Sequence, residues 1–313
     1  MKTPTIVDVG PRDGFQVVKP FIPTQKKIEI CQALIKAGVT RLEAGAFVSP
    51  TAIPQMRDIR EVLSALGAQP HVELSVLVPN RRGAEDALEA GIDALVYVVS
   101  ASDAHSKSNV RRSSAEAMAE MLGVLSELRP SGRFRFNIAT AFHCPFEGPT
   151  PHQVVLDMIG RVVEVRPDAE IGLCDTTGYA SPPDVTALVQ AVRRSFGDRV
   201  TLAYHAHDTY GFGVASVMAA WDAGVTIFDA AVAGLGGCPF APGATGNVAT
   251  EDVVYAFARR GIAVGIDLPQ LFAAAESVEL LEGADTGGHL RKMRRGRKSA
   301  GLRAKIWQDP HIQ

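Results

Sequence analysis

Two histidines in the stretch "YHAHD", His205 and His207, have the spacing of a metal-binding pair. Residues i and i+2 of a β-strand point to the same face, so both imidazoles are expected to project together. A single histidine in an apolar run is more often a satisfied core residue, whereas two at this spacing near a strand end favour a shared ion. The pair therefore predicts a metal site at the end of a strand.

Oxygen donors that could complete this site stand after other apolar runs. Asp13 follows the first run in "GPRDGFQ", and Asn247 closes the loop after the last one. Two imidazoles with oxygen donors and no thiolate suit Mg²⁺ or Mn²⁺, and could also accept Zn²⁺ or Co²⁺. A structural zinc site would contain more cysteine.

Three further charged side chains stand in or directly after apolar runs. Arg12 is next to Asp13, and in isolation this pair favours a salt bridge at the edge of the core. Glu43 lies inside "RLEAGAF", where burial of an acid is costly without a cation, a metal or a proton. Asp175 stands at the tip of "LCDTTG". These residues are candidates because they share the strand ends with the predicted ligands.

The stretch "GLGGCPFAPGATGN", residues 234–247, holds five glycines, two prolines and one cysteine, Cys238. Glycine is used where φ is positive or where the backbone must approach another group closely, and proline fixes φ. This composition disfavours a regular helix or strand and predicts a loop of defined shape around one thiol. The simplest interpretation of Cys238 is a small buried hydrophobe, and the surrounding glycines disfavour it.

The elements that must position these residues alternate along the chain. Short apolar runs are separated by longer helical patterns, several of which have proline at their start and glycine at their end. Strands are expected over 5–10, 41–47, 72–78, 94–100, 134–140, 170–176, 201–207 and 227–234. Helices are expected near 24–37, 55–66, 81–90, 114–128, 151–165, 182–195, 212–223 and 248–260.

Eight such units without a break in composition predict a (β/α)₈ TIM barrel, in which chemistry occurs at the C-terminal ends of the strands. The alternative is a doubly wound open sheet, and the lack of a GxGxxG motif in the first unit disfavours it. Residues 1–284 are expected to form one catalytic barrel with a further helix over 271–284.

Residues 285–313 are expected to form a basic C-terminal tail. Positions 290–305 hold eight Lys or Arg in sixteen residues. A role in binding nucleic acid or phosphate is one alternative for this segment. A solvated, partly disordered terminus is the favoured interpretation.

Composition restricts the class of protein. The chain has 313 residues, 46% hydrophobic and 21% charged, with a formal net charge of −2, so no nucleic-acid partner is indicated. No apolar stretch is long enough to span a bilayer, and the first residues, "MKTPTIVDVG", lack a secretory or transit pattern. We therefore expect no membrane partner and a cytoplasmic location. The four cysteines form no CxxC pair and are expected to be free thiols.

Five motifs, in order over about residues 5–262, carry a resemblance to a known family. They are "VDVGPRDGFQ", "EAGAFVSPTAIPQMRD", "CDTTG", "YHAHDTYG" and "GLGGCPFAPGATGNVATED". On these motifs the chain is identified as a member of the 3-hydroxy-3-methylglutaryl-CoA (HMG-CoA) lyase family, within the DRE-TIM metallolyase superfamily. The cysteine loop is the most specific motif, because related synthases and aldolases share the metal motifs but lack this form of loop.

The resemblance implies a homodimeric TIM barrel that binds a divalent cation, Mg²⁺ or Mn²⁺, and cleaves HMG-CoA to acetyl-CoA and acetoacetate. The metal ligands that it implies are Asp13, His205, His207 and Asn247. Arg12 resembles the arginine that stabilises the enolate of the departing acetyl-CoA. Lys107 and Asn109, in "SASDAHSKSNVRR", resemble residues of the CoA-binding region. Further residues that match positions implicated in catalysis are Glu43, Asp175 and Cys238.

Such a cleavage needs a base for the 3-hydroxyl, a polarised carbonyl and a group that holds and then protonates the thioester enolate. A divalent ion chelated by the hydroxyl and the carboxylate would lower the pKa of the hydroxyl. The sequence leaves Asp175 and His205 as alternative bases. Arg12 would stabilise the enolate oxygen by on the order of 3 kcal/mol. Cys238 would protonate the enolate carbon or shuttle a proton.

Several positions depart from the family pattern. Ala46 stands where a hydroxyl residue is common, His143 where glycine is usual, and Phe212 where glutamine is usual. Phe15 replaces a common leucine. The surroundings of the reactive groups are therefore bulkier or more apolar, and the substrate could have drifted to citramalyl-CoA or a 3-hydroxy-3-alkylglutaryl-CoA. A condensing synthase or a 4-hydroxy-2-oxoacid aldolase is a second alternative, and a catalytically silent barrel with a binding role is a third.

Overall fold

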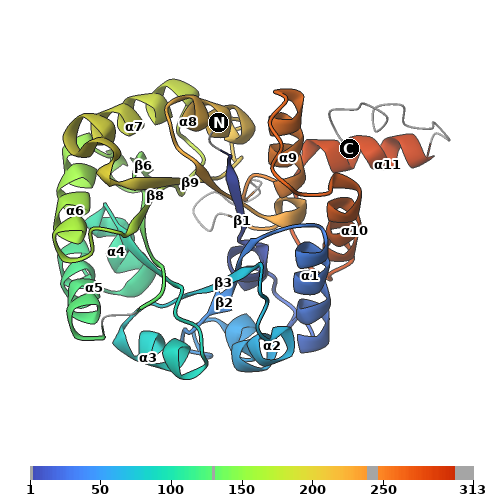
Figure 1. The fold of residues 1–313 in the computed structure, drawn as a ribbon, viewed down its shortest axis with the longest axis horizontal. Coiled ribbons are helices and arrows are strands. Elements are labelled where there is room, and N and C mark those ends of the chain that lie inside the picture. Colours follow the sequence, from blue (N-terminus) through green and yellow to red (C-terminus); the bar gives the residue numbers. More distant parts are fainter. Residues whose placement is uncertain (1–2, 129–130, 238–245, 300–313) are drawn as a thin grey trace.

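The computed structural model describes residues 3–128, 131–237 and 246–299. Within these ranges, parallel strands close into a barrel in the order β1-β10-β9-β8-β5-β4-β3-β2, and helices surround it (Figure 1). The strands are β1 (Thr5–Asp8), β2 (Arg41–Ala46), β3 (Glu73–Leu77), β4 (Leu95–Ser100), β5 (Phe134–Ala139), β8 (Glu170–Asp175), β9 (Thr201–Ala206) and β10 (Ile227–Ala230). The TIM barrel expected from the alternating patterns is confirmed.

The helices coincide with the expected ones to within a few residues. Those that cover the barrel are α1 (Thr24–Lys36), α2 (Ile59–Leu66), α3 (Arg81–Glu89), α5 (Ser114–Leu128), α6 (His152–Val165), α7 (Pro182–Phe196), α8 (Gly213–Asp222) and α9 (Thr250–Arg259). Their starts follow local signals in the sequence. At α7, for example, Ser181 and Asp184 form a capping box, which satisfies backbone N–H groups that the helix leaves free.

An ion-pair network closes the N-terminal end of the barrel. Arg41 donates from Nε to Glu73 over 2.7 Å and from Nη2 to Glu170 over 2.9 Å. Arg133 donates to the same two carboxylates, each over 2.6 Å. Because these charges satisfy one another, this end stabilises the barrel, and reactive groups are expected at the opposite end.

The first and last strands end earlier than expected. After β1, the residues "GPRDG" form a single π-helical turn, η1 (Gly10–Gly14), and Gly10 N donates to Asp8 Oδ1 over 2.9 Å. After β10, the chain enters a 3-10 turn, η4 (Val232–Gly234), in which Ala233 has a φ of 61°. Both turns lie at the C-terminal end of the barrel, and single π-helical turns are frequent at functional sites.

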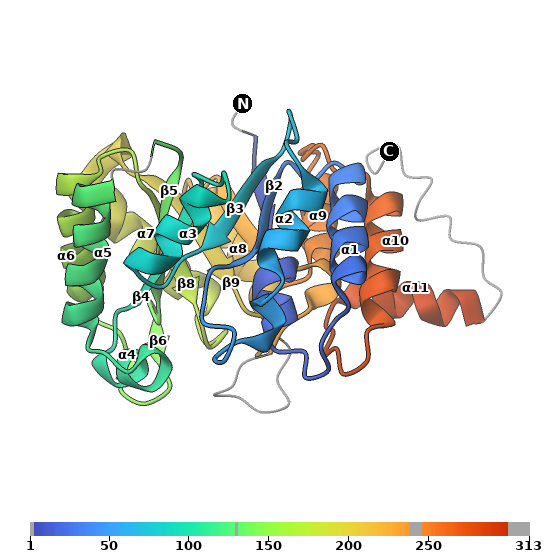
Figure 2. The same cartoon turned by 90° about the horizontal axis from the view of Figure 1, so that it is seen from below.

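Two small elements project at this C-terminal end. They are α4 (Asp103–Val110) and the hairpin of β6 (His143–Cys144) with β7 (Gly148–Pro149). Figure 2 shows α4 and β6 together at one end of the barrel. Both belong to the loops that follow barrel strands, which in this fold carry binding residues.

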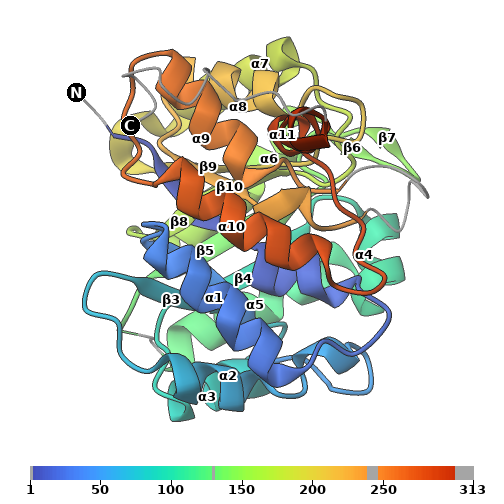
Figure 3. The same cartoon turned by 90° about the vertical axis from the view of Figure 1, so that its right-hand side faces the viewer.

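The C-terminal segment differs from the expected solvated terminus. The helix α10 (Leu268–Glu279) runs alongside α1 (Figure 3), and α11 (His289–Ser299) contains the start of the basic segment. Asp252 accepts from the backbone N–H groups of His289 over 2.7 Å and Leu290 over 3.0 Å. Arg291 is buried and pairs with Glu279. The first turn of α11 is therefore packed, because α9 and α10 supply acids that neutralise it.

No helix in the described part of the chain is both long and apolar enough to cross a membrane. The three cysteines that lie in this part, Cys31, Cys144 and Cys174, are buried free thiols, as expected. Cys238 lies outside the described residues.

Candidate functional site

The predicted metal ligands Asp13, His205 and His207 meet at the C-terminal end of the barrel. One ligand atom from each lies within 4.8 Å of the others. Both histidines are buried, and the Asp13 side chain is 13% exposed. Asp13 comes from η1 after β1, whereas the histidines come from β9 and the residue after it. Because only β10 separates β1 from β9, residues 192 positions apart in sequence become neighbours.

Asn247 joins this cluster. Its Nδ2 donates to Asp13 Oδ2 over 2.7 Å and to the Leu235 carbonyl over 3.2 Å. Its Oδ1 is buried and has no hydrogen-bond partner among the described residues, and Nε2 of His207 faces Asp13 Oδ2 at 3.9 Å. Buried polar atoms are rarely left without a partner, so this unsatisfied acceptor beside a carboxylate points to a missing ligand.

The electrostatics of the cluster also suit a cation. Burial alone raises the pKa of Asp13, but Arg12, His205 and His207 hold that pKa well below its usual range, so the carboxylate is ionised. Burial and the neighbouring His205 lower the pKa of His207 to about 4, which leaves a neutral imidazole. An ionised carboxylate, neutral imidazole and an amide oxygen form a donor set that fits a divalent cation.

Asp229 on β10 is a buried carboxylate next to His205, and it is not among the residues selected from the sequence. It lies 3.2 Å from His205 Nδ1, and Arg135 Nη1 donates to it over 2.7 Å. Although burial raises its pKa, Arg135 and His205 bring the pKa of Asp229 below its ordinary value. An ionised carboxylate only accepts, so Nδ1 of His205 carries the proton and Nε2 is the nitrogen that can bind a cation.

Arg12 is held between two carboxylates. Its Nε donates to Glu43 Oε1 over 2.7 Å, its Nη2 donates to Glu43 Oε2 over 3.4 Å, and its Nη1 pairs with Asp13. Both Arg12 and Glu43 are buried. The salt bridge expected between Arg12 and Asp13 is therefore present. Glu43 is paired with Arg12, which supplies the cation that a buried acid requires. The network fixes the guanidinium at the edge of the metal-ligand cluster.

Asp175 ends β8 and is bound by its own following turn. Its Oδ1 accepts from Tyr179 N over 3.0 Å and its Oδ2 from Ala180 N over 3.1 Å. Burial raises the pKa of Asp175 to about 7, and these backbone hydrogen bonds oppose the shift only in part. A carboxyl group that changes charge near neutral pH has the property needed for proton transfer.

A cavity of about 150 Å³ lies against Arg12 and the ligand residues Asp13, His205 and His207. Residues of β4, α4, β5 and β8 also line it, and Asp175 lies between two of the lining residues, Cys174 and Thr176. The complete lining is Arg12, Asp13, Val98, His105, Asn109, Asn137, Ala139, Cys174, Thr176, His205, His207 and Gly237. Drug-sized ligands occupy pockets of roughly 300 Å³ or more, so this cavity suits a small reacting group.

The stems of the cysteine loop close one edge of the cavity. Gly237 is part of the lining, and Gly246 packs so tightly on Gly236 that a Cβ at 246 would lie 2.4 Å from the Gly236 carbonyl carbon. Glycine at position 246 is therefore required by close backbone approach. Cys238 itself lies outside the described residues, so its predicted role stays a prediction.

The two residues expected to bind CoA, Lys107 and Asn109, both lie on α4 but face different surroundings. Asn109 lines the cavity. Lys107 is exposed and pairs with Asp103 over 3.2 Å, one helical turn away. The structure thus brings Asn109 to the site and leaves Lys107 on the solvent side of the helix.

The positions that depart from the family pattern lie outside the cavity lining. Ala46 is buried at the end of β2, and Phe15 is buried in the core. His143 stacks on Tyr179 with ring centroids 4.1 Å apart, and Phe212 is exposed before α8. A change of acyl substrate is therefore not explained by direct contact of these residues with the cavity.

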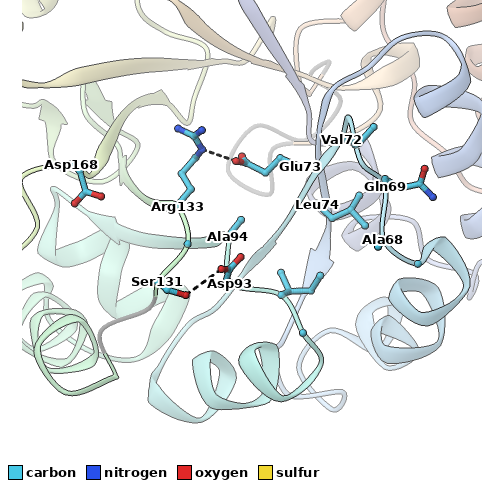
Figure 4. A pocket seen from close by; sticks show the side chains of 14 residues that line it. Ala68, Gln69, Val72, Glu73, Leu74, Asp93, Ala94, Ser131, Arg133 and Asp168 are labelled. Atoms are coloured by element: carbon cyan, nitrogen blue, oxygen red, sulfur yellow. Dashed lines mark hydrogen bonds and ion pairs between the residues drawn. The ribbon is translucent and has the colours of Figure 1, made fainter.

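A larger hollow, of about 640 Å³, lies at the N-terminal end of the barrel between β3, β4 and β5 (Figure 4). Its charged residues have partners: Arg133 pairs with Glu73, Asp168 pairs with Arg166, and Ser131 donates to Asp93. Because catalytic groups of this fold lie at the C-terminal end, we assign function to the smaller cavity.

A family model described as HMGL-like matches residues 3–278. The chain belongs to the HMGL-like family. The (R)-citramalyl-CoA lyase of Chloroflexus aurantiacus is 39% identical over 287 residues, which cover 88% of this chain and 90% of that relative. The hydroxymethylglutaryl-CoA lyase YngG of Bacillus subtilis is 36% identical over 279 residues, with 89% and 93% covered.

A solved structure gives the same assignment. An HMG-CoA lyase from Acinetobacter baumannii, in complex with coenzyme A and 3-methylmalate, matches with a TM-score of 0.87 at 37% identity. The match covers 97% of this chain and 96% of that one. The relatives bear the names of carbon–carbon lyases, and the family resemblance inferred from the motifs is confirmed.

Proposed function

We propose that this chain is a divalent-metal-dependent 3-hydroxyacyl-CoA lyase that cleaves HMG-CoA to acetyl-CoA and acetoacetate. The observation that carries the proposal is the cluster of Asp13, His205 and His207, which lies with Arg12 against one small cavity. A charged guanidinium beside a cation site is what a thioester enolate requires. Membership of the HMGL-like family supports the same reaction class.

Asp13, His205, His207 and Asn247 would hold the metal ion, for which Mg²⁺ and Mn²⁺ are the best candidates on donor type. When bound, the ion would polarise the oxygens of the substrate and make the 3-hydroxyl more acidic. Asp229 would keep His205 in the tautomer with Nε2 free for the ion. Asp13 would remain ionised because Arg12 pairs with it.

The hydrogen bond of His205 to Asp229 bears on the choice of base. With Nδ1 engaged by Asp229 and Nε2 needed for the ion, neither nitrogen is left to accept a proton. We therefore assign the base to Asp175, whose pKa is raised to about 7. Asp175 would take the proton of the 3-hydroxyl as the C2–C3 bond breaks and its electron pair passes to the thioester carbonyl.

Arg12 would stabilise the negative oxygen of the resulting enolate, because its guanidinium is fixed by Glu43 and Asp13 before substrate arrives. The enolate carbon must then gain a proton to give acetyl-CoA. Cys238 is the proposed donor, or the relay for it, since Gly237, the residue before it in the sequence, lines the cavity. Asn109 and Lys107 are proposed to contact the CoA portion.

The acyl group distinguishes two versions of the proposal, since a citramalyl-CoA lyase is among the relatives. Both thioesters would give acetyl-CoA, but the second product is acetoacetate from HMG-CoA and pyruvate from citramalyl-CoA. Steady-state kcat/KM for each thioester, with both products measured, tests the assignment. A higher kcat/KM for citramalyl-CoA would move the acyl assignment to that substrate. No acetyl-CoA from either thioester in the presence of Mn²⁺ would refute lyase function.

A condensing synthase or aldolase of the same superfamily is the second candidate. It would consume acetyl-CoA, or release pyruvate from a 4-hydroxy-2-oxoacid without any CoA ester, and the same product assays detect both. A homodimer and a cytoplasmic location are further proposals, and sedimentation of the purified protein measures the first.

A further inference from the structure

We propose that His143 positions the general base, because it holds Tyr179 so that the backbone N–H of Tyr179 binds Asp175. This inference rests on the proposed lyase function, in which Asp175 is the base. It also gives a task to one of the positions that depart from the family pattern. His143 acts through Tyr179 and is not part of the cavity lining, so it is a positioning residue and not a catalytic one.

Two backbone groups of the turn after β8 bind the carboxylate of Asp175. Tyr179 N donates to Oδ1 over 3.0 Å, and Ala180 N donates to Oδ2 over 3.1 Å. Ala180 is also tied to α8, because its carbonyl accepts from Ser216 Oγ over 3.2 Å. The position of Tyr179 N depends instead on the contacts of the Tyr179 side chain.

The side chain of Tyr179 is about half exposed and contacts two other aromatic rings. It stacks on His143, with ring centroids 4.1 Å apart and an angle of 20° between the planes. The ring of Tyr210 meets it in a T-shaped arrangement at 5.8 Å. The three rings come from the loops after β5, β8 and β9, so they join neighbouring loops at the C-terminal end of the barrel. Such aromatic pairs stabilise a structure beyond the area that they bury.

His143 is itself fixed by the hairpin in which it lies, so it can serve as an anchor. It opens the β6–β7 pair as the register partner of Pro149. The next residue, Cys144, is buried, and its Sγ donates to Ser102 Oγ over 2.9 Å. The hairpin therefore keeps the ring of His143 against Tyr179.

Stacking, and not hydrogen bonding, is the contribution of the imidazole. Nδ1 of His143 is buried and has no hydrogen-bond partner among the described residues. Burial lowers the pKa of His143, which favours the neutral ring. A phenyl ring can therefore replace the imidazole without loss of a described hydrogen bond. This makes His143→Phe the conservative variant and His143→Ala the disruptive one.

Steady-state kinetics of the two variants test the inference, with HMG-CoA or citramalyl-CoA as substrate. His143→Ala should lower kcat by about 2- to 10-fold with KM near the wild-type value, because the base is less often in position while the cavity lining is intact. His143→Phe should restore kcat. A purely structural role would lower the thermal midpoint of His143→Ala and leave its kcat unchanged, and this result would overturn the inference.

Phe212→Ala is the matched control for the loss of an aromatic ring. Phe212 is an exposed residue in the loop after β9, immediately before α8, and it lies outside the stack. Its replacement should leave kcat as in the wild type. An equal decrease of kcat in Phe212→Ala and His143→Ala would overturn the specific task of His143.

Amide hydrogen exchange, measured by NMR without substrate, separates this inference from the proposed function. In His143→Ala, protection of the Tyr179 N–H should fall by about 2- to 10-fold, whereas that of the Ala180 N–H should stay near the wild-type value. This result would support the inference even if neither thioester is cleaved. Wild-type protection of Tyr179, an equal loss at Ala180, or a kcat in His143→Phe as low as in His143→Ala would overturn it and leave the lyase function intact.

Discussion

The two nitrogens of His205 have different tasks, and this division depends on Asp229. Asn at position 229 would keep the size of the side chain but remove the charge that holds the Nδ1 proton. We expect Asp229→Asn to weaken Mn²⁺ binding by about 10- to 100-fold, the usual cost of losing the partner of a metal-binding histidine. Titration of the apo protein with Mn²⁺, followed by electron paramagnetic resonance, measures this directly.

Asp222→Asn is a matched control, since Asp222 is an exposed carboxylate that pairs only at the surface with Arg260. It should leave the Kd for Mn²⁺ unchanged. Equal Mn²⁺ affinities for Asp229→Asn and the wild-type protein would remove Asp229 from the account of the site.

The second prediction for a single residue concerns Asp175 as the general base. Removing a general base typically costs 10²- to 10⁴-fold in rate, so Asp175→Asn should lower kcat by that amount. In the wild-type protein, kcat/KM should rise with pH through about 7, because the base must be ionised to accept the proton. A pH profile between 5 and 9 checks both statements. An active Asp175→Asn variant that keeps the same acid limb would assign the base elsewhere.

Single residues were predictable where their spacing is local. His205 and His207 are recognisable by an i, i+2 spacing, whereas Asp229 and Arg135 act through partners on other strands. The signal that could have found these two is a charged residue inside an apolar strand, in "IFDAAVAG" and "FRFNIAT". Pairing across a barrel is set by strand order and register, which no local pattern contains.

At the level of elements, two acids at the start of α9 hold neighbouring segments in place. Glu251 Oε2 accepts from the backbone N–H of Ala233, the residue with positive φ in the turn before the cysteine loop. The next residue, Asp252, accepts from the backbone N–H groups of the first two residues of α11. Glu251 is fully buried, and its Oε1 has no partner among the described residues.

This burial predicts a pH dependence of stability. Burial raises the pKa of Glu251 to about 8, so the folded state binds its proton more tightly than the unfolded chain. The free energy of unfolding gained in this way is present below about pH 4.3 and is lost as pH rises through about 8. Glu251→Gln, which does not titrate, should therefore flatten the decline between these limits. Urea unfolding across this pH range measures the slope.

Asp8 and Asp175 also have raised pKa values, about 6 and about 7, so part of the decline should remain in Glu251→Gln. Exposed Glu61 on α2 provides the control, because Glu61→Gln should leave the slope as in the wild type. A wild-type slope in Glu251→Gln would show that Glu251 is not the source.

Element types followed from the sequence more readily than element ends. The expected strand over 5–10 stops at Asp8, because the glycines and proline of "GPRDG" allow a π-helical turn that Asp8 holds by its bond to Gly10. The strand expected over 227–234 stops at Ala230 for a similar reason, a tight turn at Ala233. Both early strand ends lie beside the site. There the chain leaves regular strand geometry, and the turns that follow position Asp13 and the start of the cysteine loop.

For the whole molecule, eight alternating units without a compositional break were sufficient to predict the closed barrel. The packing of α11 was not predictable from its charge, because its neutralising partners, such as Glu279 of α10, become neighbours only in the fold. The division of the chain at residue 284 stays a proposal. Closure of the barrel also pairs β1 with β10, which places β1 one strand away from β9 and so assembles the ligand cluster.

The central claim is that this barrel cleaves a short 3-hydroxyacyl-CoA with the help of one divalent ion. Acetyl-CoA formation from HMG-CoA should be measured on protein treated with EDTA and then titrated with Mn²⁺. The account predicts no cleavage by the treated protein, and activity that rises to a plateau as one Mn²⁺ per chain is bound. Cleavage that persists unchanged in EDTA, or inert protein with one Mn²⁺ bound per chain and both thioesters supplied, would contradict it.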